Sequence, residues 1–284
     1  LGLYSNAAAS SVAIIDSIQL MQDIGTITES TGFAGTKDDV VVTTGGTLIL
    51  DTLGLFDSTA GNFDDAVGLF DGGGGTVDNL GTYDFATKTD LTNKFTAKVT
   101  PFITVSRTDY VNTFDDASGN FDAREGDFDG DATAFDDTNV EFQIATTDDD
   151  PASGGATFTA FRRFIAGDYT ARGFKYRVVL TSADTQATPV ISVLGVKVAM
   201  QDSTRAEVDV ASGTSTDGKA VTFSPAFKEL QGLNISAQNL ASGDFYAITS
   251  KSATGFTIEF FNSGGSTVNR TFDYVAKGYG EKVS

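Results

Sequence analysis

The sequence predicts an all-β protein made of two successive β-sandwiches, and three observations support this. Only seven of its 38 acidic residues are Glu, so the acidity lies in Asp, which favours turns and caps over helix interiors. The segments between the Asp-rich turns are filled with Thr, Val, Phe and Ile, which fit a pleated sheet. The 31 Gly supply turn conformations. With 284 residues and no Cys, the chain can hold two domains without disulfides.

The first predicted elements are a connector and a large sandwich. Residues 1–17 are mostly small or apolar, and we expect them to connect to an upstream region, since the chain begins at Leu1. Residues 18–203 are expected to form a jelly-roll-like β-sandwich, because short apolar strands alternate there with long loops. Thr-Thr-Gly-Gly at 43–46 predicts a turn. The expected strands are 18–28, 40–42, 47–50, 81–85, 94–99, 102–106, 140–145, 158–165, 174–181 and 190–200.

Residues 204–284 are expected to form a second, smaller β-sandwich. Six strand-like segments follow one another there at the close spacing typical of a compact sandwich. Side chains alternate across a strand, so Phe256, Ile258 and Phe260 should share the core face while Phe261 lies opposite. Tyr246, Tyr274 and Tyr279 are open to two interpretations, namely core packing or stacking on a sugar through an exposed ring. The expected strands are 206–210, 220–223, 233–237, 245–249, 256–261 and 271–276.

A Gly-x-Phe-Asp signature recurs five times at steps of seven residues within two clusters. Glycine at every seventh position argues against a coiled coil, so we expect ordered loops in which Phe63, Phe121 and Phe128 are buried in a shared layer. Asp127, Asp129 and Asp131 are candidate Ca²⁺ ligands. We favour the alternative that Asp caps the next turn, because Ca²⁺ needs converging oxygens. The copies are at 54–57, 61–64, 68–71, 119–122 and 126–129.

Composition excludes several classes of function. The chain has no His and no Cys, so it cannot form a Ser-His-Asp or Cys-His catalytic group. A pair of carboxylates could cleave a glycoside, but the abundance of acids makes such a pair uninformative, and we expect no enzyme. The sequence contains no run of 18 apolar residues, so it predicts no membrane-spanning segment. A net charge of −19 argues against nucleic acid as a partner.

A basic cluster between residues 162 and 177 has two interpretations. It could recognise an anionic surface sugar, or its side chains could pair with the Asp-rich loops. We favour internal pairing, because Arg binds carboxylates bidentately. The cluster consists of Arg162, Arg163, Arg172, Lys175 and Arg177.

Three stretches of the C-terminal half carry a family resemblance. They are 171–200 with the Thr188-Pro189-Val190 strand start, 221–262 with Phe223, Phe227 and Gly255-Phe256, and 268–280 with the terminal FDYVAKGYG. In this order they are similar to the C-terminal part of bacteriophage tail fibre and tail-tip host-specificity proteins. The last unit also resembles, more weakly, the H-type lectin fold, with Tyr274 in place of the Trp usual in its last strand.

The resemblance implies a virion protein in the phage tail that displays β-sandwiches to the host. It implies a homotrimer, contacts with other tail proteins, and a host glycan or outer-membrane protein as receptor. The alternatives are a secreted bacterial carbohydrate-binding or adhesin module and, from a different class, a polysaccharide depolymerase. We expect the distal loops of the last unit to contact the receptor, since loops on a rigid scaffold commonly carry recognition. The candidate residues are Asp244, Tyr246, Asn262, Arg270, Tyr274 and Tyr279.

Overall fold

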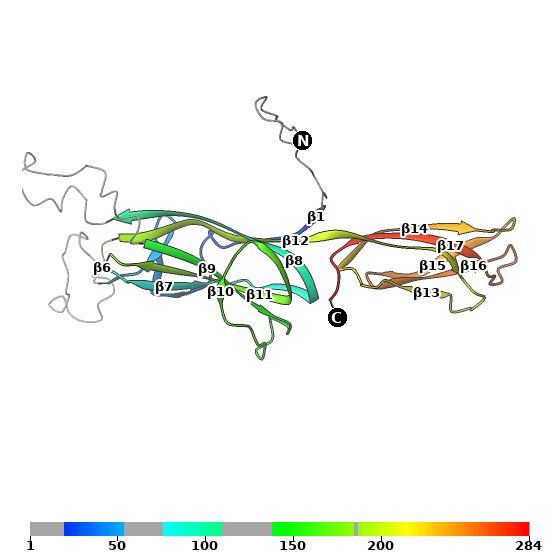
Figure 1. The fold of residues 1–284 in the computed structure, drawn as a ribbon, viewed down its shortest axis with the longest axis horizontal. Coiled ribbons are helices and arrows are strands. Elements are labelled where there is room, and N and C mark those ends of the chain that lie inside the picture. Colours follow the sequence, from blue (N-terminus) through cyan, green and yellow to red (C-terminus); the bar gives the residue numbers. More distant parts are fainter. Residues whose placement is uncertain (1–19, 54–75, 110–137, 185–186, 284) are drawn as a thin grey trace, which may run out of the picture.

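The computed structural model describes residues 20–53, 76–109, 138–184 and 187–283, and it confirms the all-β prediction. Within these ranges the chain forms antiparallel strands and no helix. Two units follow one another along the long axis, with β1–β12 in the first and β13–β17 in the second (Figure 1).

The first unit is a sandwich of two antiparallel layers. In one layer β11 lies between β7 and β9, with β2 beyond β7 and β10 beyond β9. In the other layer β12 pairs with β8, β1 and β4. The strands are β1 Met21–Thr28, β2 Thr36–Asp38, β3 Val40–Val42, β4 Leu48–Leu50, β5 Thr52–Leu53, β6 Thr76–Val77, β7 Leu80–Asp84, β8 Thr89–Asp109, β9 Thr138–Thr147, β10 Arg162–Arg163, β11 Gly167–Ser182 and β12 Ala187–Ala211.

Strand β8 joins the two layers of the first unit. Its first half pairs with β11 up to Val99, and its second half pairs with β12 from Lys98 onward. The sequence predicts two strands here, 94–99 and 102–106, but the structure has one strand through Pro101. Proline lacks an N–H, and it is tolerated because the pairing with β11 has ended before Pro101, which leaves one side of the strand unpaired.

The core of the first unit is closed by a buried polar contact. The Tyr83 hydroxyl donates to Glu29 Oε2 over 2.5 Å and accepts from Gly35 N over 2.8 Å. Glu29 and Tyr83 are both buried, and burial raises the pKa of the Tyr83 hydroxyl. This contact fixes the turn 29–35 against β7. The two segments lie so close together that a side chain at position 35 would clash with Asp84 and Tyr83, which explains the glycine there.

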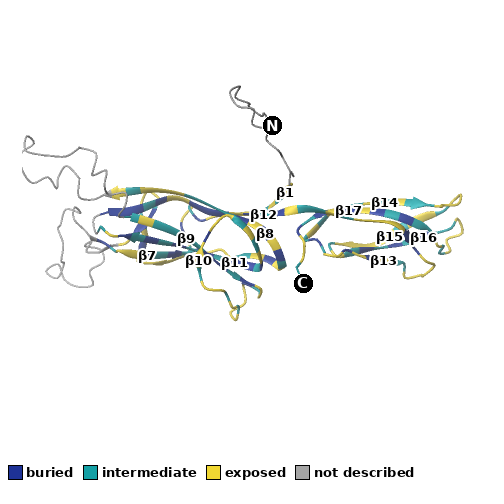
Figure 2. Cartoon of the chain, viewed as in Figure 1, coloured by how far each residue is buried: buried dark blue, intermediate teal, exposed yellow. Residues whose placement is uncertain are grey.

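The second unit is a smaller sandwich of two three-stranded layers. One layer has β17 between the end of β12 and β14, and the other has β16 between β13 and β15. Phe256, Ile258 and Phe260 face inward as predicted, and the buried residues form a separate core between the layers (Figure 2). The strands are β13 Lys219–Thr222, β14 Glu229–Gln238, β15 Phe245–Ser252, β16 Gly255–Phe261 and β17 Thr271–Tyr279.

Strand β12 belongs to both units. Its residues 187–201 pair within the first unit, and residues 202–211 pair with β17 in the second. The boundary predicted between residues 203 and 204 therefore lies inside a continuous strand. A side chain of the second unit and the C-terminal residues also connect the two units by hydrogen bonds. The Lys228 ammonium donates to Leu91 O over 2.7 Å, and Val283 N donates to Lys94 O over 2.9 Å.

The strand predicted over 158–165 is mostly wrong. Only Arg162 and Arg163 form a strand paired with β9, while Thr159 N and Phe164 N make single hydrogen bonds to Thr146 O and Phe142 O of β9 from outside that strand. The pattern misled because Phe164 packs into the core whereas Phe158 and Phe161 are covered by basic side chains of β7–β8 and β11. The Gly-x-Phe-Asp clusters, with Phe63, Phe121 and Phe128, lie outside the described residues.

Candidate functional site

Three loops of the second unit meet at the end farthest from the first unit. They are the β12–β13 loop 212–218, the β14–β15 loop 239–244 and the β16–β17 loop 262–270. The register brings them together, because Ala211 pairs with Thr271, which in turn pairs with Gln238. We refer to this end as the distal tip, and Figure 1 shows it at the right.

An ion pair joins two of the distal loops. Arg270 Nε donates to Asp244 Oδ2 over 2.6 Å, and a second guanidinium nitrogen contacts the same oxygen. Asp244 also accepts from Ala241 N over 2.8 Å. The bond from Ala241, reinforced by the Arg270 guanidinium, holds the pKa of Asp244 below its usual value. The Asp244 side chain is only 2% exposed, so it positions the loops rather than facing solvent.

The third loop is tied to the same arginine by its backbone. Ser212 N donates to Arg270 O over 2.9 Å, and Arg270 N donates to Ser212 Oγ over 2.8 Å. Gly213 N donates to Asn269 Oδ1 over 2.8 Å. These bonds make the distal tip a cross-linked surface in which the loops hold fixed positions relative to one another.

Aromatic rings border these loops at the start of β15 and the end of β16. Phe245 is 51% exposed and stacks on Phe261 with 5.1 Å between ring centroids. Tyr246 is 40% exposed and lies against Phe260 at 5.5 Å. Asn262 caps the turn that follows, since its side-chain oxygen accepts from the N–H groups of residues 264 and 266. Flat exposed rings beside polar loops can hold the apolar face of a sugar.

Two of the predicted site residues do not belong to the distal tip. Tyr274 and Tyr279 are on β17 rather than in loops, which corrects the prediction. Tyr274 is 6% exposed and packs against Phe223 and Phe256, because it shares the inward face with Phe272 and Ala276. Tyr279 lies at the junction of the units, where its hydroxyl donates to Glu229 over 2.6 Å. The tip therefore gathers Asp244, Tyr246, Asn262 and Arg270.

Phe245 is the tip residue that sequence reasoning missed. The sequence predicts a strand from this position and indicates no site there, whereas the structure exposes the Phe245 ring on the outer face. The predicted outward position of Phe261 could have revealed the exposure of Phe245. The two residues lie directly opposite each other on neighbouring strands, so their side chains share a face of the sheet.

The internal pairing expected for the basic cluster is found for two of its five side chains, while Arg162, Arg163 and Lys175 form no ion pair with any described residue. Arg172 contacts Asp90 and Asp150, and Arg177 forms a bidentate pair with Asp84. The bond to Asp84 raises the pKa of Arg177, and that to Asp90 raises the pKa of Arg172.

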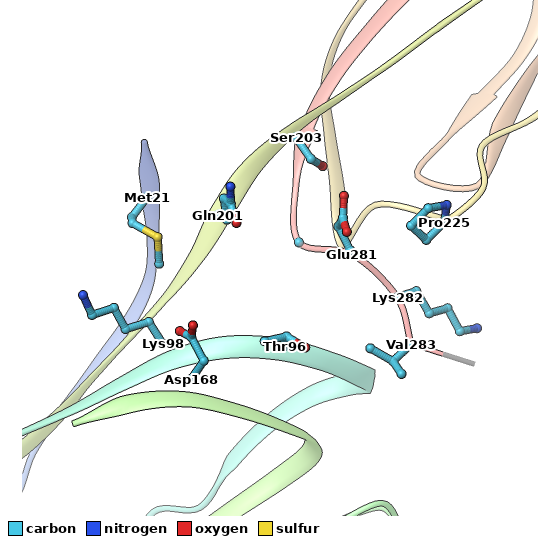
Figure 3. Close-up of a pocket in the computed structure, with 11 residues that line it drawn as sticks. Met21, Thr96, Lys98, Asp168, Gln201, Ser203, Pro225, Glu281, Lys282 and Val283 are labelled. Carbon is cyan, nitrogen blue, oxygen red and sulfur yellow. The ribbon is translucent and has the colours of Figure 1, made fainter. Parts of the chain in front are cut away.

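A cleft of about 570 Å³ lies at the junction of the units (Figure 3). Its walls come from β1, β8, β11, β12 and the tail, and they carry both charges, with Lys98 and Lys282 against Asp168 and Glu281. Glu281 is already paired with Arg205, and no aromatic ring lines the cleft. Because the positive and negative charges of the lining are equal in number, they favour no particular class of ligand.

Neither a metal centre nor a membrane-spanning helix occurs among the described residues. No three Asp or Glu side chains there come together in a way that could hold a metal ion. No helix in the same ranges is long and apolar enough to cross a membrane. Asp127, Asp129 and Asp131, the candidate Ca²⁺ ligands, lie outside these ranges.

Comparison of the chain with models of protein families, with characterised proteins and with solved structures finds no match.

Proposed function

We propose that this chain is the receptor-binding segment of a bacteriophage tail fibre or tail tip, and that its distal tip contacts the host surface. One observation carries the proposal. The tip is the end of the second unit farthest from the first, and it places the exposed Phe245 ring, stacked on the half-buried Phe261, beside three loops that Arg270 holds together. The resemblance of the C-terminal segments to tail fibre proteins supports the same reading.

The chemistry of the tip fits a glycan or a protein loop on the outer membrane of the host. The Phe245 ring offers an apolar platform, and the amide nitrogen of Asn262 makes no hydrogen bond to any described residue, so it can donate to a receptor hydroxyl. Each contact is weak. Several tips on one virion would raise the overall affinity through multivalency.

A homotrimer assembled with other tail proteins is part of this proposal. The second unit exposes Val208 to 69% and Val275 to 48% on β12 and β17, and neighbouring copies would cover such side chains. Mass photometry at micromolar concentration, on protein that includes any upstream region, should give three copies. A monomer would remove this part of the proposal.

The test is adsorption of virions that carry single substitutions in the tip. Phe245→Ala should slow adsorption roughly tenfold by removing about 1.4 kcal/mol of receptor contact, and Arg270→Ala should have a similar effect by releasing the loops that it joins. Tyr246→Ala should have a smaller effect, because its ring already packs on Phe260. Lys251→Ala is the matched control, since this exposed residue lies near the other end of β15.

Unchanged adsorption for all three tip variants, with the fold intact, would contradict the proposal. The chain should also release no reducing ends from host polysaccharide, and release would place it with depolymerases instead. A tail-assembly gene neighbourhood is expected, whereas a secretion signal on the parent polypeptide would favour a bacterial adhesin.

A further inference from the structure

A groove of about 740 Å³ lies on the first unit, beside the segment that connects β9 with β11. This segment hangs below the sheet in Figure 1. It is lined by the buried Phe85 and Tyr176, by Phe158 and Phe161, and by the charged side chains of Lys88, Lys175 and Asp84. The groove is part of a different unit from the distal tip, so the two are separate surfaces.

Three cationic groups surround two phenyl rings in this groove. The Lys175 ammonium is 4.7 Å from the ring centroids of both Phe158 and Phe161. The Lys88 ammonium is 5.5 Å from the Phe158 centroid, and the Arg177 guanidinium is 4.4 Å from that of Phe161. Lys175 contacts both rings, so positive charge is concentrated around this pair of rings.

The positive charges of the two lysines are not balanced within the groove. Arg177 is neutralised by Asp84. Lys88 donates to the uncharged carbonyl of Pro151 over 3.0 Å, and Lys175 forms no ion pair with any residue in the described ranges. The groove therefore brings together two ammonium groups that have no carboxylate partner among the described residues. An external anion would supply the missing partner.

We propose that this groove binds a saccharide that carries an anionic group. Lys88 and Lys175 would donate to its carboxylate or phosphate, since a charged donor makes a stronger hydrogen bond to an ionised acceptor. The edges of Phe158 and Phe161 would contact the apolar face of the sugar ring. Thr36 and Ser153, which also line the groove, would hydrogen-bond its hydroxyls. The proposal does not depend on the tail fibre assignment.

Calorimetric titration of the whole chain tests the charge requirement. The probes are an oligogalacturonate, its fully methyl-esterified form as a neutral copy of the same backbone, and a phosphorylated dextran. At least one charged probe should bind about tenfold or more tightly than the neutral one, and binding should weaken with salt. Comparing the two charged probes tells whether carboxylate or phosphate is preferred. Equal affinity for charged and neutral probes, or no binding to any, overturns the proposal.

Substitutions then locate the site. Lys175→Gln should weaken binding of the charged probe about tenfold, the loss expected for one charge-assisted hydrogen bond. Lys88→Gln should act in the same direction, and Lys175→Arg should retain binding because the charge stays over the rings. Lys251→Gln in the second unit removes the same charge elsewhere and should have no effect. Thermal melting confirms that each variant is folded, and unchanged binding in the folded Lys88→Gln/Lys175→Gln variant overturns the proposal.

Discussion

The two units share a sandwich plan but differ in how their cores are filled. Among its described residues the first has 24 buried in its core, with aliphatic and aromatic side chains spread over many strands. The second has ten, and six of these are aromatic, namely Phe223, Phe227, Phe256, Phe260, Phe272 and Tyr274. A small domain buries a smaller fraction of its surface, so each large side chain carries more of its stability. The stability of the second unit therefore depends on a few aromatic rings, whereas that of the first depends on many side chains.

The largest expected effect comes from removing one ring of the second core. Phe272 is fully buried and stacks on Phe260 at 5.8 Å, so Phe272→Ala should cost about 3–5 kcal/mol. We expect the second unit to melt before the first. Hydrogen exchange should then show lost protection in β16 and β17 and retained protection in β9.

The matched variant in the first unit sharpens this comparison. Phe174 is also fully buried, and Phe174→Ala should cost a similar amount but lower protection throughout β7, β9 and β11. If Phe272→Ala reduced protection equally in both units, the two would unfold together and the contrast between them would be wrong.

A medium effect is expected at the buried polar contact of the first unit. Tyr83→Phe removes the hydroxyl that donates to Glu29 and accepts from Gly35. The buried Glu29 carboxylate then loses its hydrogen bond from Tyr83. Denaturant unfolding should show a loss of about 1–3 kcal/mol. Tyr169→Phe is the control, because its hydroxyl bond to Ile165 O is exposed and its loss should be within about 0.5 kcal/mol. Equal losses of unfolding free energy in Tyr83→Phe and Tyr169→Phe would show that the burial of a hydrogen bond does not determine the cost of removing it.

The smallest effect concerns the junction at alkaline pH. Burial, with the Glu229 carboxylate beside it, raises the pKa of Tyr279 to about 12 from its usual 10.0. The fold therefore favours the neutral phenol, and this contribution to stability is complete below pH 10 and is lost as the pH rises through about 12. Tyr279→Phe should flatten the pH dependence of unfolding between these values. An identical dependence in the variant would exclude Tyr279 as its source.

Much of the fold could be predicted from the sequence because local patterns and burial agree there. Strand β16 alternates strictly, and the structure buries the residues that the alternation marks. The failures have physical reasons. The separate strands expected over 94–99 and 102–106 are one strand, because Pro101 lies where one side of β8 has no partner. Phe158 and Phe161, expected in a strand, are instead covered by lysine and arginine side chains.

The candidate site could be predicted only in part. Asp244 and Arg270 were singled out as potential receptor contacts, and the structure joins them to each other across two loops. Such pairing over 26 positions depends on strand register, which no local pattern records. Tyr274 follows the same rule, since its place in the core is set by the phase of β17 rather than by its polar hydroxyl.

Strand β12 has a consequence for exchanging modules between proteins. Domains are usually swapped at flexible linkers, but here Met200 faces the first core and Val210 faces the second on one unbroken strand. An insertion or deletion of one residue between them would turn every following side chain of the strand to the opposite face. The alternation is already shifted once between Glu207 and Val210, where β12 has one residue more than β17, so a graft of another terminal unit must preserve both the number of residues across Gln201–Asp209 and this irregularity. The natural place to cut this protein is not between its two units.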